Sequence, residues 1–326
     1  MKKHTTKIGI FFLLLLLVVT LCACKNEQIQ PAQSPVPTAQ TVSGPPITVI
    51  TDGGDLSGGI KTGAEKAAAD LGAVVTVKSP PSPSDSDGQL DLLDQALANN
   101  PAAICIAAID TEAVMPFLER AQKLGIPIIG IGNVDLGDIA IVICAADNAA
   151  GGVIAAEKMA EHMNGQGQIG ILLGSETNSD DQARRDGFTD FITENHPNME
   201  IVTVQYHADE DTAQIAMDMI ESYPDIKGIF AATPQSANAV AAIVKDYTMD
   251  IVIIGFGSGA QQIKDIRDGI QTGAIAPNSV NMGYVAIDAA LKSVRGQTPE
   301  AAIDTGTLWY DKDNIDSDQI KPLLHQ

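Results

Sequence analysis

Positive charge, cysteine and aromatic side chains are all scarce in this sequence of 326 residues. Lysine and arginine together number 20 against 41 acidic residues, which gives a formal net charge of −21 at pH 7. A surface of this sign repels nucleic acids and anionic lipid headgroups, so the composition argues against DNA or RNA binding. The four cysteines form no CxxC pair and no Cys/His spacing of a metal site, and we therefore expect neither a metal nor a cofactor.

Residue sets for catalysis are missing as well. The sequence shows no Ser/His/Asp set, no cluster of metal ligands and no paired catalytic carboxylates within one loop. The glycines at 53–59 do not match GxGxxG, which argues against a nucleotide site. We therefore expect a protein that is not an enzyme, and an exported enzyme remains the rival interpretation.

Two of the cysteines lie in apolar runs that are typical of strands. Cys105 stands in AAICIAAI and Cys144 in IAIVICAAD. Free cysteines in such runs are ordinarily buried and behave as small hydrophobic side chains. We expect both to be structural.

The chain opens with a basic and then strongly apolar leader. Three lysines precede an apolar run at 8–21, which is shorter than the roughly 20 residues needed to span a bilayer and has the length of a secretory signal. The run ends in LCAC, which resembles a lipobox, although Cys22 stands where a smaller residue is usual. We expect a lipoprotein signal peptide at 1–23 and lipid attachment at Cys24, on the outer face of the cytoplasmic membrane. An ordinary signal cut elsewhere, or an uncleaved anchor, remains the alternative.

Residues 24–46 form the next segment, in which Pro, Gln, Ser and Thr dominate. So little apolar content cannot bury a core, and the prolines keep the chain extended. We predict a disordered tether that holds the folded body away from a membrane.

From residue 46 onward, short β-rich runs alternate with longer helical ones, as in the run at 46–51 and the helical content at 56–71. Strict alternation predicts α/β architecture, with parallel sheets covered by helices on both faces. The units are too many for one sheet, so we expect two doubly wound parallel-sheet lobes. Further strands are predicted at 73–77, 102–107, 127–131, 168–173, 200–205, 226–231, 251–255 and 272–276, with a closing run near 303–309. Further helices are predicted at 89–99, 111–124, 180–195, 211–222, 235–247, 259–268 and 280–295.

Ligands of such sheets bind beyond the carboxyl ends of the strands. The loops at these ends are therefore the places to look for a site. They are predicted at 52–58, 132–138, 174–180, 206–209, 232–236 and 257–260.

A series of motifs runs through the body of the chain. They are GIPII at 125–129, AADN at 145–148, RRDGF at 184–188, YPDI at 223–226, IIGF at 253–256 and WYDKDNI at 309–315. In their order and spacing they resemble those of ribose- and galactose-type sugar-binding proteins, which have the type I periplasmic-binding-protein fold. The resemblance extends from Ile47 to the C-terminus.

This resemblance implies two lobes joined by three hinge segments, with chain crossings near Asp147, Pro277 and Gly306. It implies a solute-binding lipoprotein of an ABC importer, which captures a small sugar or sugar-like solute and passes it to a membrane permease. The protein is expected to be a monomer. Hinge closure around the solute is the expected motion. A sensor for a chemoreceptor or a histidine kinase remains an alternative, as does import of a polyol, nucleoside or small acid. The implied N-terminal lobe is 47–146 plus 277–305, and the C-terminal lobe is 147–276 plus 306–326.

Several sugar-contact positions of the family are altered here. The loop after the first strand, DGGDLS at 52–57, contains no aromatic ring. The paired Asp after the fourth strand falls on Gly132, the Asp of the family's GFD motif on Gly257 and the hinge Gln on Pro277. A typical aldose needs stacked rings and bridging carboxylates or amides, so these changes leave the identity of the solute open.

Arg184 is the family pocket residue that is clearly retained. Its planar fork donates to two acceptors at once, such as vicinal hydroxyls or a carboxylate. An ion pair with Asp180 or Asp181 on a helix surface is the plainer interpretation. Other candidate ligand contacts are Asp52, Asp55, Asn133, Asp135, Thr233 and His207. Helix capping by the first two, turn formation by the next two and a solvated loop position for His207 explain these residues equally well.

Overall fold

The structure is a computed structural model that describes residues 44–208 and 210–324. The predicted signal peptide, Cys24 and nearly all of the predicted tether lie outside these residues. The described residues belong to one compact unit of the chain. Within the described ranges, no helix is both long enough and apolar enough to cross a membrane.

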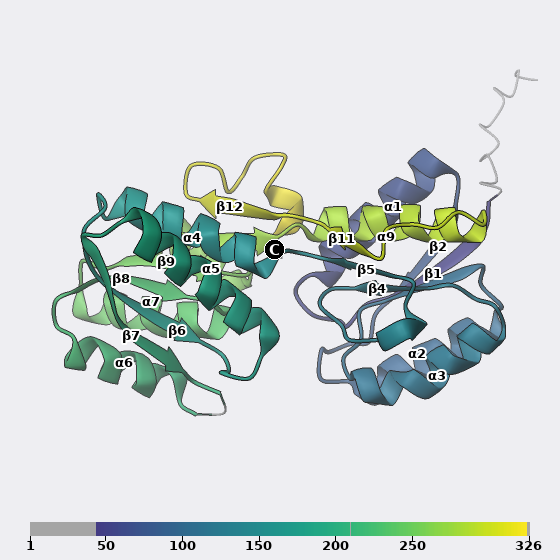
Figure 1. The fold of residues 1–326 in the computed structure, drawn as a ribbon, viewed down its shortest axis with the longest axis horizontal. Coiled ribbons are helices and arrows are strands. Elements are labelled where there is room, and N and C mark those ends of the chain that lie inside the picture. The colour runs from purple at the N-terminus through teal and green to yellow at the C-terminus, as the bar shows by residue number, and fades with distance from the viewer. Residues whose placement is uncertain (1–43, 209, 325–326) are drawn as a thin grey trace, which may run out of the picture. The chain divides into compact units, whose positions relative to one another are not determined.

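The first sheet has six parallel strands in the order β11-β5-β4-β3-β1-β2. Its helices α1 and α9 lie on one face, and α2 and α3 lie on the other (Figure 1). The strands are β1 (Pro46–Ile50), β2 (Val74–Lys78), β3 (Ala103–Ile106), β4 (Ile128–Ile131), β5 (Val142–Ala145) and β11 (Ala302–Asp304). The helices are α1 (Ser57–Leu71), α2 (Ser86–Ala98), α3 (Thr111–Lys123), the short η1 (Gly137–Ile139) and α9 (Ser279–Val294).

Strand β3 shows why this sheet needs helices on both faces. Ala103 and Cys105 join the core cluster beneath α1 and α9, while Ile104 and Ile106 join the cluster beneath α2 and α3. Side chains of a strand alternate between faces, so a continuously apolar strand must be covered twice. Burial raises the pKa of the Cys144 thiol to about 12 and raises that of Cys105 as well. Both cysteines are free and buried, which confirms that they are structural.

The second sheet has the order β12-β10-β9-β8-β6-β7. Helices α4 and α5 cover one face, and α6 and α7 cover the other. The strands are β6 (Gly167–Leu173), β7 (Met199–Tyr206), β8 (Ile226–Ala231), β9 (Val252–Phe256), β10 (Gly273–Pro277) and β12 (Thr307–Asp311). The helices are α4 (Asn148–His162), α5 (Ser179–Asn195), α6 (Thr212–Ser222), α7 (Pro234–Tyr247), α8 (Ala260–Asp268) and the short η2 (Lys321–Leu323).

The predicted α/β class with two doubly wound sheets is confirmed, and two details differ. The closing run predicted near 303–309 is two strands, β11 in the first sheet and β12 in the second. β12 is also antiparallel to β10, with Thr307 beside Pro277. Because β11 ends at the carboxyl edge of its sheet and only two residues follow, the chain enters the second sheet at its carboxyl edge and must run in the opposite direction.

Strand β5 and helix α4 occupy the stretch between the strands predicted at 127–131 and 168–173. Cys144 had indicated a strand there, but the helix was not predicted. Its first half is NAAGGVIAA, in which alanine and glycine give no strong amphipathic pattern.

Candidate functional site

The site is built on the close approach of helices α4 and α5. A Cβ at Gly152 of α4 would overlap the carbonyl oxygen of Arg184, and a Cβ at Gly187 of α5 would overlap that of Ala149. Glycine at both positions lets the two backbones pack without side chains between them. This packing brings the side chain of Arg184 on α5 to Asn148 at the start of α4.

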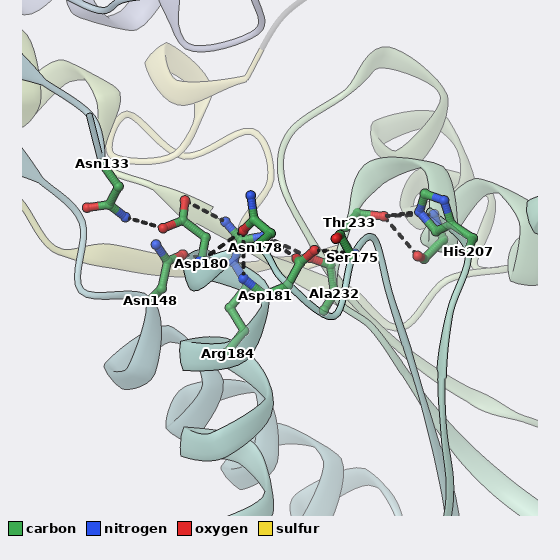
Figure 2. Close-up of polar contacts among 11 residues, drawn as sticks. Asn133, Asn148, Ser175, Asn178, Asp180, Asp181, Arg184, His207, Ala232 and Thr233 are labelled. Carbon is green, nitrogen blue, oxygen red and sulfur yellow. Dashed lines mark hydrogen bonds and ion pairs between the residues drawn. The ribbon is translucent and has the colours of Figure 1, made fainter. Parts of the chain in front are cut away.

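The Arg184 guanidinium has four polar neighbours (Figure 2). Its Nε donates to Oδ1 of Asn148 at 2.8 Å, and its Nη1 donates to the carbonyl oxygen of Ala232 at 3.0 Å. Nη1 also lies 3.4 Å from Oδ1 of Asp181, and Nη2 lies 3.8 Å from Oδ2 of Asp180. These partners come from three different elements, so the guanidinium is fixed in position.

Arg184 is also packed against an apolar surface. Its guanidinium carbon lies 4.0 Å from the centre of the Phe256 ring at the end of β9. The ion pairs of the plainer interpretation, with Asp180 and Asp181, are both present, but the arginine side chain is only 15 % exposed. Burial lowers the pKa of Arg184, while the carboxylates of Asp180 and Asp181 act in the opposite direction. An arginine in such a setting keeps its charge.

Asp181 is held as firmly as the arginine. Its side chain is 7 % exposed, and its Oδ2 accepts a hydrogen bond from the backbone N–H of Ser175 at 2.8 Å. Asn178 caps the helix, with its Oδ1 accepting from the backbone N–H groups of Asp180 and Asp181. This cap replaces hydrogen bonds that the first turn of a helix cannot make internally.

A cleft of about 530 Å³ lies beside this network. Asn133, from the loop after β4, donates from Nδ2 to Oδ1 of Asp180 at 2.7 Å, and the network therefore links a loop of the first sheet to helix α5 on the second (Figure 2). Asp135 also lines the cleft, with one carboxylate oxygen accepting from the backbone N–H of Gly137, as its turn-forming interpretation predicts. The lining residues are Asn133, Val134, Asp135, Ile143, Ala146, Asp147, Asn148, Ala149, Ser179, Asp180 and Ala183. Arg184, Asp181, Thr233 and His207 are not among them, and Arg184 adjoins the cleft through its contacts with Asn148 and Asp180.

Thr233 and His207 lie together at the other end of the network (Figure 2). Thr233 is the N-cap of α7, and its Oγ1 accepts from the backbone N–H of Ser236. The His207 ring lies 3.4 Å from this oxygen through Nε2 and 3.1 Å from the carbonyl oxygen of Ala208 through Nδ1. Thr233 directly follows Ala232, whose carbonyl oxygen accepts a hydrogen bond from Arg184. Thr233 and His207 therefore extend the polar network around Arg184.

Asp52 and Asp55 lie on the loop that leads into α1, and neither lines the 530 Å³ cleft. Oδ1 of Asp52 accepts from the backbone N–H of Gly54 at 2.9 Å and from the hydroxyl of Ser57 at 3.0 Å. That carboxylate therefore holds its own loop together, but it does not cap α1, whose N-cap residue is Leu56 without a side-chain cap hydrogen bond. Asp55 is exposed, and its Oδ2 lies 3.7 Å from the position a Cβ would take at Gly259.

Gly257 and Gly132, which the resemblance places at positions of family aspartates, differ in the space around them. Gly257 has φ of +113°, and a Cβ there would come within 2.7 Å of Cγ of Pro234. Gly132 has φ of +77°, but a Cβ there would meet nothing within 4 Å. A side chain at 257 would therefore clash with Pro234, whereas at 132 only the backbone conformation opposes a side chain.

Sequence reasoning missed the buried partners of Arg184. Asn148 and Phe256 each belong to a motif that was recognised, AADN and IIGF, but neither was singled out as part of a site. The backbone carbonyl of Ala232 carries no sequence signal at all.

The Gly187→Ala variant tests the helix packing. Alanine gains about 1 kcal/mol of helix propensity over glycine, so any net loss must come from the overlap with Ala149. We expect a net loss of about 2 kcal/mol in the free energy of unfolding, measured by urea denaturation. Glu194→Ala, at an exposed position of the same helix, should change stability by less than about 0.5 kcal/mol. A Gly187→Ala protein as stable as the wild type would show that this glycine does not set the approach of α4 and α5.

Comparisons with known proteins agree with the architecture. A family model described as a periplasmic binding protein domain matches residues 49–298. The ribose import binding protein of Bacillus subtilis is 24 % identical over 308 residues, which cover 93 % of this chain and 97 % of the relative. The D-ribose/D-allose-binding protein of Pseudomonas aeruginosa is 26 % identical over 229 residues, which cover 67 % and 70 %.

A solved structure shows the same fold. AraP, an arabinose-binding protein from Geobacillus stearothermophilus, matches with a TM-score of 0.79 and 26 % identity, covering 84 % of this chain and 99 % of AraP. All three relatives are named as binding proteins, in agreement with the expectation of a binding protein and not an enzyme. With a family model that spans most of its length and two parallel-dominated sheets covered by helices, the chain belongs to the periplasmic binding protein family.

Proposed function

We propose that this protein captures a small sugar or sugar-like solute outside the cytoplasm and delivers it to the permease of an ABC importer. The observation that carries the proposal is the placement of Arg184. Its guanidinium is fixed beside a polar cleft, where the carboxyl ends of strands β8 and β9 meet the start of α4. The names of the relatives, which bind ribose, allose or arabinose, support a sugar as the solute.

The polar groups around Arg184 suit a ligand with several hydroxyls. The guanidinium donates, and the carboxylates and amides nearby accept, so hydroxyls that do both can be matched on either side. We propose that the solute contacts Arg184, with Asn133, Thr233 and His207 along the same network. Asp52, Asp55 and Asp135 are proposed as further contacts, through the carboxylate oxygens that local hydrogen bonds leave free.

We also propose that the two sheets are the cores of two lobes that close around the solute. The chain passes between the sheets three times, after β5, β10 and β11, which supports boundaries near Asp147, Pro277 and Gly306. Oδ1 of Asp304 accepts from the backbone N–H groups of Asp147 and Gly306 and so ties the first and third crossings together. In this proposal 47–146 plus 277–305 form one lobe, and 147–276 plus 306–326 form the other.

The leader supports a location on the membrane surface. We propose that the protein is cleaved after residue 23, is lipidated at Cys24 and acts as a monomer tethered by residues 24–46. The family supports an extracytoplasmic location, and the lipobox-like LCAC supports the anchor.

A thermal-shift screen of the purified protein tests the proposed function. Pentoses, hexoses, polyols, nucleosides and small acids should be compared at millimolar concentration. A ligand present at 100 times its Kd adds about 2.7 kcal/mol to the stability of the folded state, which corresponds to a rise in Tm of roughly 5–10 °C for a body of this size. A sugar should give this shift, and a panel without any shift would contradict the proposal.

A further inference from the structure

We propose that Asp181, assisted by Asp180, sets the charge selectivity of the cleft by holding Arg184 and cancelling its charge, so that the site excludes anionic solutes. Asp181 is thus a positioning residue for Arg184. This inference rests on the proposed function, because it concerns the solute that the same cleft takes.

Two carboxylates lie within 4 Å of the one guanidinium. Asp181 is 3.4 Å from Nη1 and Asp180 is 3.8 Å from Nη2. Asp181 is the more constrained of the two, because its second oxygen accepts from the backbone N–H of Ser175 and its side chain is almost fully buried. An arginine with two acids at this range offers no net positive charge to an incoming anion.

The donors of Arg184 are also largely taken. Nε donates to Asn148, and Nη1 is occupied by Ala232 and Asp181. Of the three guanidinium nitrogens, only Nη2 makes no hydrogen bond to the described residues. A carboxylate binds arginine best through two parallel N–H groups on neighbouring nitrogens, and two such free groups are not available here. A single free nitrogen suits one hydroxyl of a neutral solute.

The residues that line the cleft carry negative charge. The described residues that line the cleft include the carboxylates Asp135, Asp147 and Asp180 but no lysine, arginine or histidine. An anion would enter beside the carboxylates of Asp135 and Asp147, and specificity in binding sites commonly comes from such repulsion of the wrong ligand. The exclusion of anions therefore depends on the Arg184 pairing and on the lining together.

Matched sugars and matched variants test the inference. D-galacturonate is compared with D-galactose and L-arabinose, and D-glucuronate with D-glucose and D-xylose, because each set shares ring stereochemistry and differs only at C5. The wild-type protein, Asp181→Asn and Asp180→Asn are titrated by calorimetry at pH 7. Asp186→Asn is the control, since this carboxylate lies on the same helix, is 57 % exposed and pairs with Arg185.

In the wild type, the neutral sugar should bind at least about 10-fold more tightly than its uronate. The ratio of the Kd of the uronate to the Kd of the neutral sugar measures this selectivity. Asp181→Asn should lower the ratio at least about 10-fold and Asp180→Asn by a smaller factor, while Asp186→Asn should leave it unchanged. A general loosening of the site would weaken both ligands and leave the ratio alone, so the ratio separates selectivity from structural damage.

Two results would overturn the inference and leave the proposed function standing. The first is a uronate that the wild type binds as tightly as the neutral sugar, and the second is a ratio that stays the same in both Asp181→Asn and Asp180→Asn. If no member of either set binds although another sugar of the thermal-shift panel does, the inference fails and the proposed function stands. If no sugar of the panel binds, both fail.

Discussion

Replacing Arg184 by alanine is expected to weaken solute binding roughly 30-fold or more. The guanidinium is the one cation among the contacts at the centre of the network, and removing a charged donor from a desolvated contact costs on the order of 2–5 kcal/mol. Isothermal titration with the solute found in the screen measures the change. Arg184→Lys should recover only part of the loss, because an ammonium cannot reach Asn148 and Ala232 together as the planar fork does.

The same substitution is also expected to lower stability. Without Arg184, the buried carboxylate of Asp181 keeps only the N–H of Ser175 as a partner, and we expect a loss of about 2 kcal/mol in the free energy of unfolding. Arg185→Ala is the matched control, since its side chain pairs with Asp186 and Tyr206 and not with the partners of Arg184. It should leave affinity within about 2-fold of wild type.

An Arg184→Ala protein that folds and binds the solute with unchanged affinity would contradict the proposed site. In that case Arg184 would serve only to join α4, α5 and the loop after β8, and the solute would lie elsewhere.

Cys24→Ala is expected to abolish lipid attachment. The change removes the thiol to which lipid would be added, and a cleaved protein without an acyl anchor has no apolar leader to insert in the bilayer. Fractionation of cells followed by immunoblotting should show the variant either released or retained as the longer, uncleaved precursor. The effect is all or none, because both processing and anchoring depend on the same residue.

Cys22→Ala is the control for the anchor. It places the small residue usual in a lipobox two positions before Cys24, and it should leave lipidation intact. If the Cys24→Ala protein fractionates and migrates like the wild type, the lipobox interpretation is wrong, and either Cys22 or an ordinary signal must be considered.

The alternation of strands and helices could be predicted from the sequence because the central strands of these sheets are mostly apolar. β3 and β8 read as AICI and IKGIFA, and a segment buried on two faces carries that signal by itself. The direction of β12 could not be predicted in this way. It depends on where the preceding strand leaves the other sheet, which is a property of the topology and not of the segment TLWYD.

Residues of the site could be predicted only where they belong to a recognisable motif. RRDGF indicated Arg184, but its partners lie 36 residues away at Asn148 and 48 residues away at Ala232, and no local pattern links them. Asp52 and Asp135 show the opposite difficulty. An aspartate that accepts hydrogen bonds within its own loop has the same sequence context as one that holds a ligand, because both occur in loops after strands.

The most direct test of the central claim is calorimetric titration of the purified protein with the sugar that gives the largest thermal shift. The account predicts saturable binding of one solute per chain, in the wild type and in Arg185→Ala, and at least 30-fold weaker binding in Arg184→Ala. Absence of saturable binding by any sugar, or equal affinity in the wild type and Arg184→Ala, would contradict capture of a sugar-like solute beside Arg184.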